Sequence, residues 1–121
     1  MNRLSSLFLT IAALLAALAA DAQHVDVAPR RIEVGFNKTV HILFPSPVTY
    51  IDIGSMDIIA GKAAGAENVV RVKAAVRNFA AETNLTVITE DGGFFTFDVY
   101  YAENPAVSTL NLTAVSYTHL R

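Results

Sequence analysis

Hydrophobic and polar residues alternate with a period of two along most of the chain beyond its first thirty residues. A pleated strand turns successive side chains to opposite faces, so this alternation predicts strands that place one face against a core. The expected strands are residues 31–36, 39–44, 48–53, 57–60, 69–77, 84–90 and 94–101. Residues 110–113 can begin another strand, and no stretch indicates a helix. The pattern favours an antiparallel β-sandwich of the immunoglobulin-like kind, with about seven short strands.

Two of these strands flank the corner Phe44-Pro45-Ser46-Pro47, and the other strands are expected to be added around them. Val40, Ile42 and Phe44 should face the core. The two prolines should end the first strand, because neither has an N–H group to donate. Such a corner lets a chain leave one sheet and enter another, or turn along an edge. In the second strand, the alternation predicts that one face holds Thr49, Ile51 and Ile53 and the other holds Val48, Tyr50 and Asp52.

Turn residues predict how the strands connect. Asn37-Lys38 lies between the first two strands, and asparagine tolerates the positive φ of a two-residue hairpin, so these strands should pair antiparallel. Asp91-Gly92-Gly93 is a second hairpin signal. The small residues 61–66 are expected to form a loop. Its Gly61-Lys62 pair does not have the spacing of a phosphate-binding loop, and no Ser or Thr follows the lysine.

The strand over residues 69–77 carries three cations on its predicted outer face, namely Arg71, Lys73 and Arg77. The opposite face should fill the core, and its residues are Val70, Val72, Ala74 and Val76. Two interpretations are open. The cations can form a solvated face that protects a sheet edge from aggregation, or they can contact an acidic partner. Direct nucleic-acid binding is not expected, because no aromatic residues alternate with these charges and the net charge is −2.

The composition and the two ends of the chain indicate its domain organisation. The 121 residues contain no cysteine, so neither disulfides nor thiolate metal sites contribute, and the length allows a single domain. Residues 1–22 have the pattern of a secretory signal peptide, with cleavage expected before Gln23 and a retained anchor as the alternative. Residues 23–30 should be a flexible lead-in and 31–113 the β-sandwich. Residues 115–121 resemble a translated sequencing-adapter tail, so 114–121 are expected to be non-native.

Residues typical of catalysis or metal binding do not form a recognisable set. His24, His41 and His119 are far apart in the sequence, whereas zinc sites usually draw ligands from close spacings. No serine lies in a nucleophile elbow, and the adjacent Glu90 and Asp91 should point to opposite faces. We therefore predict no catalytic, cofactor-binding or metal site and no enzyme activity. A β-sandwich with an export signal indicates a binding or structural domain.

Several short blocks in order resemble the TraN family of conjugative transposon proteins. These blocks are Phe44–Pro47, Ile53–Ser55, Asp57–Lys62, Gly65–Asn68, Arg71–Ala75 and Ile88–Gly92. The early region is more distantly similar to the β-domain of TrbG-type subunits of type IV secretion core complexes, in the strand, Phe-Pro corner and strand that include Phe44–Val48.

The resemblance implies a structural component of a conjugative DNA-transfer apparatus in the cell envelope, similar to type IV secretion systems. It implies an exported protein, located in the periplasm or associated with the outer membrane. Its partners would be other subunits of the apparatus in an oligomeric ring, contacted through the cations of residues 71–77. Outer-membrane association is expected through a C-terminal part that follows this region in the family, or through partners. The alternative function is a free periplasmic or surface domain that binds a small ligand or glycan.

Overall fold

The computed structural model describes residues 26–114, which form eight strands and no helix. The strands are β1 (Arg30–Val34), β2 (Val40–Leu43), β3 (Val48–Ile53), β4 (Ile58–Ala63), β5 (Ala66–Ala74), β6 (Thr83–Thr89), β7 (Phe94–Tyr101) and β8 (Thr109–Asn111). They make two four-stranded sheets, β1-β7-β6-β3 and β4-β5-β2-β8. The expected signal peptide and the segment 115–121 lie outside the described residues.

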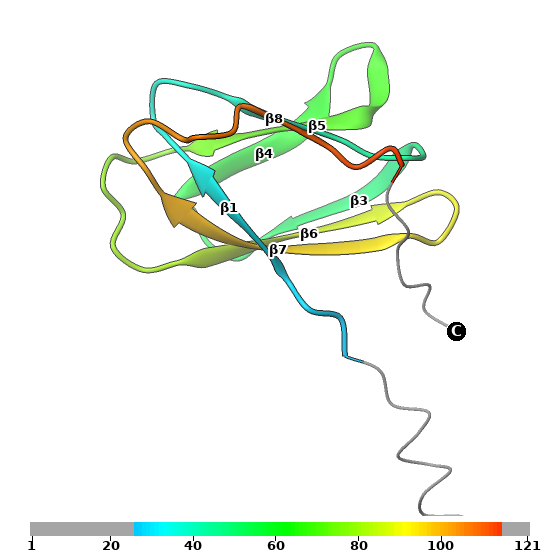
Figure 1. The fold of residues 1–121 in the computed structure, drawn as a ribbon, viewed down its shortest axis with the longest axis horizontal. Coiled ribbons are helices and arrows are strands. Elements are labelled where there is room, and N and C mark those ends of the chain that lie inside the picture. The colour runs from blue at the N-terminus through cyan, green and yellow to red at the C-terminus, as the bar shows by residue number, and fades with distance from the viewer. Residues whose placement is uncertain (1–25, 115–121) are drawn as a thin grey trace, which may run out of the picture.

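The two sheets form the two layers of a β-sandwich, with β4, β5 and β8 in one layer and β3, β6 and β7 in the other (Figure 1). The prediction of an all-β sandwich is confirmed. The orders β4-β5-β2 and β3-β6-β7 match the D-E-B and C-F-G arrangements of immunoglobulin domains. Both sheets are mixed, because the β1–β7 and β2–β8 pairs are parallel while the other four pairs are antiparallel.

The Pro-Ser-Pro corner carries the chain from one sheet to the other, since β2 and β3 belong to different sheets. Hydrogen bonds hold the chain on both sides of it. Phe44 and Asn68 are joined twice, by the Phe44 N–H to the Asn68 carbonyl at 2.8 Å and by the Asn68 amide to the Phe44 carbonyl at 3.0 Å. The Pro47 carbonyl accepts from the Glu90 N–H at 2.7 Å. Of the two outcomes expected for this corner, the structure shows the change from one sheet to the other.

The expected hairpin between the first two strands is wrong. β1 pairs in parallel with β7, whereas β2 pairs with β5 and β8 in the other sheet. The tight turn would need a positive φ at Asn37, and Asn37 does not have one. Among residues 26–114, the non-glycine residue with a positive φ is Asn78. The chain instead crosses between the sheets at the buried Gly35, whose carbonyl accepts from the Ala74 N–H at 2.9 Å.

The hairpin at Asp91-Gly92-Gly93 is confirmed and joins β6 to β7. Gly92 has a φ of 86°, in the left-handed region that glycine occupies without steric cost. The turn is closed by the Thr89 N–H, which donates to the Gly93 carbonyl at 3.0 Å, and by the Thr89 hydroxyl, which donates to Asp91 Oδ1 at 2.7 Å.

Two further sequence predictions need correction. A β-bulge between Val48 and Tyr50 shifts the side-chain alternation of β3, so Val48 is buried while Thr49 is exposed. The predicted loop over residues 61–66 is mostly strand, because β4 continues to Ala63 and only Ala64-Gly65 separates it from β5. Gly65 has a φ of 77°, which explains how so short a turn closes.

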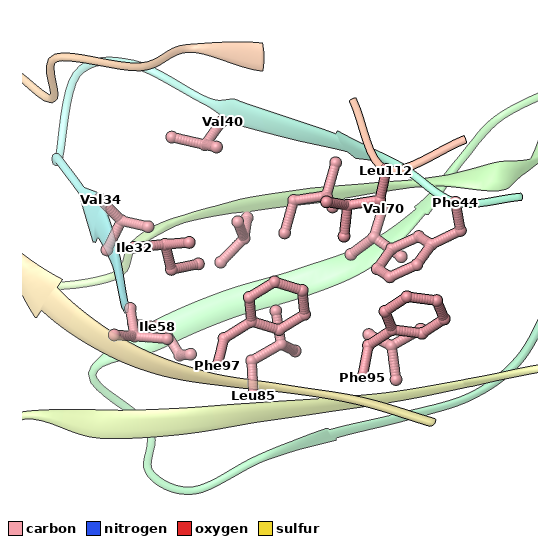
Figure 2. Close-up of a cluster of buried hydrophobic side chains, with 14 of the residues drawn as sticks. Ile32, Val34, Val40, Phe44, Ile58, Val70, Leu85, Phe95, Phe97 and Leu112 are labelled. Carbon is pink, nitrogen blue, oxygen red and sulfur yellow. The ribbon is translucent and has the colours of Figure 1, made fainter. Parts of the chain in front are cut away.

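The core lies between the sheets and is built from both (Figure 2). Phe44, at the end of β2, packs edge-on against Phe95 and Phe97 of β7, with ring centroids 4.9 and 6.3 Å apart. Val40 and Ile42 are buried as predicted. The inward alternation of β2 and β7 thus gives the aromatic contact that links the two layers.

Candidate interaction surface

The cations predicted to contact a partner lie on or beside the outer face of the β4-β5-β2-β8 sheet. Arg71 and Lys73 alternate along β5 with Val70 and Val72, which are completely buried, so both cations point away from the core. β5 is an interior strand, paired with β4 on one side and β2 on the other. The interpretation that these cations protect a sheet edge is therefore wrong.

Arg71 stands beside a shallow depression. Its neighbours across the sheet are Gly61 on β4 and His41 on β2. A Cβ atom placed on Gly61 would meet no heavy atom within 4 Å, which shows that the space next to Arg71 is open. The depression has a volume of about 140 Å³, and Lys62 and Lys73 also line it. An acidic side chain of a partner could enter here between Arg71 and Lys73.

Arg77 lies beyond the end of β5, not on it, and it joins Lys73 through an aromatic ring. The Arg77 guanidinium is 4.4 Å from the centre of the Phe36 ring, and Lys73 Nζ is 5.5 Å from the same centre. Arg77 also donates to Asn37 Oδ1 at 3.3 Å. Cation–π contacts of this kind hold a charged group in place without neutralising it. Val76, expected in the core, is 44% exposed because the strand has already ended at Ala74.

The structure therefore divides the predicted contact residues into two neighbouring parts. Arg71 is central on the sheet, and Lys73 and Arg77 converge on Phe36 at the end of β5. The sequence prediction did not include Phe36, whose ring contacts both cations. Its place directly before the predicted Asn-Lys turn is a signal that could have indicated a partly exposed aromatic contact. The sequence prediction also missed His41, whose place opposite Arg71 depends on the β2–β5 register.

The three cations have no carboxylate partner within residues 26–114. Ion pairs in this part of the chain join Arg31 to Glu33 at 3.6 Å and Lys62 to Glu67 at 2.7 Å. Exposed ion pairs contribute about 0–1 kcal/mol each, so pairing them internally would have added little stability. Left unpaired, the same charges can attract and orient an acidic partner. We call Arg71, Lys73 and Arg77 the basic surface.

A second concave region lies at the free edge of β3. It is an open groove of about 600 Å³, lined by Tyr50, Thr49, Lys62, Glu67 and Glu90 among others. Lys62 Nζ reaches across to donate to Glu67 Oε2 at 2.7 Å and to the Val48 carbonyl at 3.4 Å. Tyr50 is 49% exposed. The groove thus combines an accessible aromatic ring with an amine and two carboxylates.

Neither a metal site nor a membrane-spanning helix is found between residues 26 and 114. No three His, Asp or Glu side chains of this region gather closely enough to hold a metal ion. None of its segments forms a helix long and apolar enough to cross a bilayer. The candidate contact regions considered for function are therefore the basic surface and the groove at β3.

The profile of a protein family described as a domain of unknown function, DUF8473, matches residues 32–105. This is more than half of the chain. The chain belongs to the DUF8473 family. The matched segment begins in β1 and ends after β7, so the DUF8473 region contains all of β2 to β7 and the last three residues of β1, together with both candidate regions. No curated protein matches the sequence significantly.

Proposed function

We propose that this protein is a structural component of a conjugative DNA-transfer apparatus in the cell envelope and acts through contacts with other subunits. The observation that supports this proposal is the basic surface, whose three cations have no carboxylate partner among residues 26–114. The similarity of the Phe44–Pro47 corner and of the later blocks to TraN proteins suggests the biological setting. In this proposal the protein is exported and works in the periplasm or at the outer membrane.

The placement of the cations, two of which contact the Phe36 ring, supports a role in assembly. β5 is fixed by ladders on both sides, and Phe36 orients Lys73 and Arg77. Charges that are already ordered lose less side-chain entropy when a partner binds. Charged groups at an interface mostly set partner choice and association rate, which is the role expected of subunits that must recognise each other in a large complex.

A mating assay with the full-length protein tests the proposal. The variant Arg71→Glu/Lys73→Glu/Arg77→Glu should fold, because it changes only side chains outside the core, and it should reduce DNA transfer at least tenfold. Arg30→Glu is a matched control, since Arg30 is an exposed cation at the start of β1 and lies in the other sheet. Wild-type transfer by a triple variant that is stably expressed and has a native melting curve would contradict the proposal.

The groove at β3 favours a second candidate function, a periplasmic or surface domain that binds a small ligand or glycan. Exposed aromatic rings beside hydrogen-bonding groups are suited to the apolar face and hydroxyls of a sugar. Binding of oligosaccharides that is abolished by Tyr50→Ala, with transfer unaffected by the triple variant, would support this candidate instead. Genomic neighbours distinguish the two further, since transfer genes favour the apparatus and polysaccharide-utilisation genes favour the glycan.

A further inference from the structure

Within residues 26–114, the unpaired charges on the two outer faces of the sandwich are opposite in sign, because the carboxylate on the outer side of β5, Glu67, is already paired with Lys62. On the β1-β7-β6-β3 sheet, Asp98 lies between the buried Phe97 and Val99 and therefore points outward. Asp52 faces the same way, because Asp52 pairs with Thr86, which pairs with Thr96 two residues before Asp98. We call this outward side, with its carboxylates, the acidic face. Its carboxylates are Glu33, Asp52, Asp98 and, directly before β6, Glu82.

The single cation among the outward residues of the acidic face is already engaged within the chain. Arg31, which pairs with Asp98 in the β1–β7 ladder, makes a 3.6 Å ion pair with Glu33, and its guanidinium is 3.8 Å from the centre of the Tyr100 ring. Glu82 also has a partner within the chain, because its side chain is hydrogen-bonded to Tyr100, and this bond raises the pKa of the Tyr100 phenol. Asp52 and Asp98 form no ion pair in the part of the chain that the structure describes.

We propose that a second copy of this chain places its acidic face on the basic surface of the first. The inference rests on the proposed function, for which it names a partner. Opposite charges on the two faces make the same chain complementary to itself, whereas two copies joined through identical faces would bring like charges together. The depression beside Gly61 gives a carboxylate of the second copy a place between Arg71 and Lys73.

Such a contact is heterologous, because it uses different faces of the two copies. Each added copy leaves one acidic and one basic face free, so the assembly continues until it closes or grows as a filament. With a strand spacing of about 4.8 Å and a rise of about 3.3 Å per residue, a four-stranded face measures roughly 20 Å by 20 Å. This is less than the roughly 800 Å² per partner of standard interfaces, so each contact should be weak and sensitive to salt.

Charge reversal on each face tests the pairing in the full-length exported chain. One variant is Arg71→Glu/Lys73→Glu and the other is Asp52→Lys/Asp98→Lys. Sedimentation velocity should show concentration-dependent association of the wild type at about 10 mM salt and little at about 1 M, where the Debye length falls from about 30 Å to about 3 Å. Each variant alone should associate at least tenfold more weakly. An equal mixture should associate again, because the reversed faces complement each other.

Gly61→Leu provides a test that changes no charge. It fills the depression next to Arg71 without meeting any neighbouring heavy atom at the Cβ position, so the fold should persist while association weakens. Circular dichroism and thermal melts must show that every variant is folded. A wild type that stays monomeric up to about millimolar concentration at low salt would overturn the inference, as would a mixture no better associated than its components.

The outcomes separate this inference from the proposed function. A monomeric wild type together with a mating defect of the triple variant would refute self-association and leave the proposed function intact, with a different acidic partner. Self-association that the mixture restores, together with normal mating of the triple variant, would confirm the pairing and refute the transfer role.

Discussion

Phe44→Ala tests the organisation of the whole sandwich, because Phe44 connects the two sheets. Its side chain is completely buried at the end of β2 and contacts two rings of β7 in the opposite layer (Figure 2). The substitution leaves both hydrogen bonds between residues 44 and 68 possible, since they use only the main-chain N–H and carbonyl groups of Phe44. The perturbation is therefore confined to the ring and the space it occupies.

The expected loss of stability is about 3–5 kcal/mol, the usual cost of truncating a buried aromatic residue to alanine. The edge-on pairs with Phe95 and Phe97 each contribute about 0.5–1.5 kcal/mol beyond the free energy gained by burying the ring's surface. This contribution favours the upper part of the range. A domain of this size has a total stability of roughly 5–13 kcal/mol at about 0.05–0.15 kcal/mol per residue. The variant should consequently lose about half of its stability.

Urea unfolding followed by circular dichroism measures this loss. With a slope of about 1–2 kcal/mol/M, the midpoint should fall by roughly 2–4 M. Phe94→Ala is a matched control, because Phe94 is a half-buried ring on the outer side of β7, and it should cost about 1 kcal/mol or less. Equal losses in the two variants, or a loss below about 1 kcal/mol for Phe44→Ala, would refute the placement of Phe44 at the junction of the sheets.

Three further outcomes are expected. Gly35→Ala should destabilise the fold by about 1–3 kcal/mol in urea melts, because the added Cβ atom would lie 2.9 Å from the Ala102 carbonyl oxygen. Gly61→Ala should be neutral or stabilise by up to about 1 kcal/mol, because its Cβ atom would meet no heavy atom within 4 Å. A clear loss of stability in both variants would contradict this expectation. N-terminal sequencing of the exported protein should begin at Gln23, and a start near Met1 would instead indicate a retained anchor. Deletion of residues 114–121 should leave the melting temperature unchanged, and a drop of about 4–8 °C or more would show that the tail packs on the domain.

Much of the fold was predictable where the signal was local. The bounds of β3 and β7 match the predicted strands, and the inward positions of β2 and β7 match the alternation of their side chains. The Pro-Ser-Pro corner and the Asp-Gly-Gly hairpin were also identified, because proline and glycine restrict or extend the backbone at their own positions.

The candidate surface was predictable only in part. The alternation with buried valines identified the outward direction of Arg71 and Lys73, which is a property of one strand. The meeting of Lys73 and Arg77 at Phe36 joins residues about forty positions apart, and the place of Gly61 beside Arg71 depends on the β4–β5 register. No periodicity within a single segment carries this information.

The sequence by itself determined where most strands lie, though not all of their ends, and which side of most strands is buried, because both depend mainly on each residue's own side chain and immediate neighbours. Apart from the β6–β7 hairpin, the tertiary structure decided which strands pair. β1 joins β7 instead of β2, and β5 becomes an interior strand, because the pairing must bury every apolar strand face in one shared core. The same packing puts Asp52 and Asp98 on one outer face of the sandwich and Arg71 and Lys73 on the other, since each sheet turns only one side toward that core.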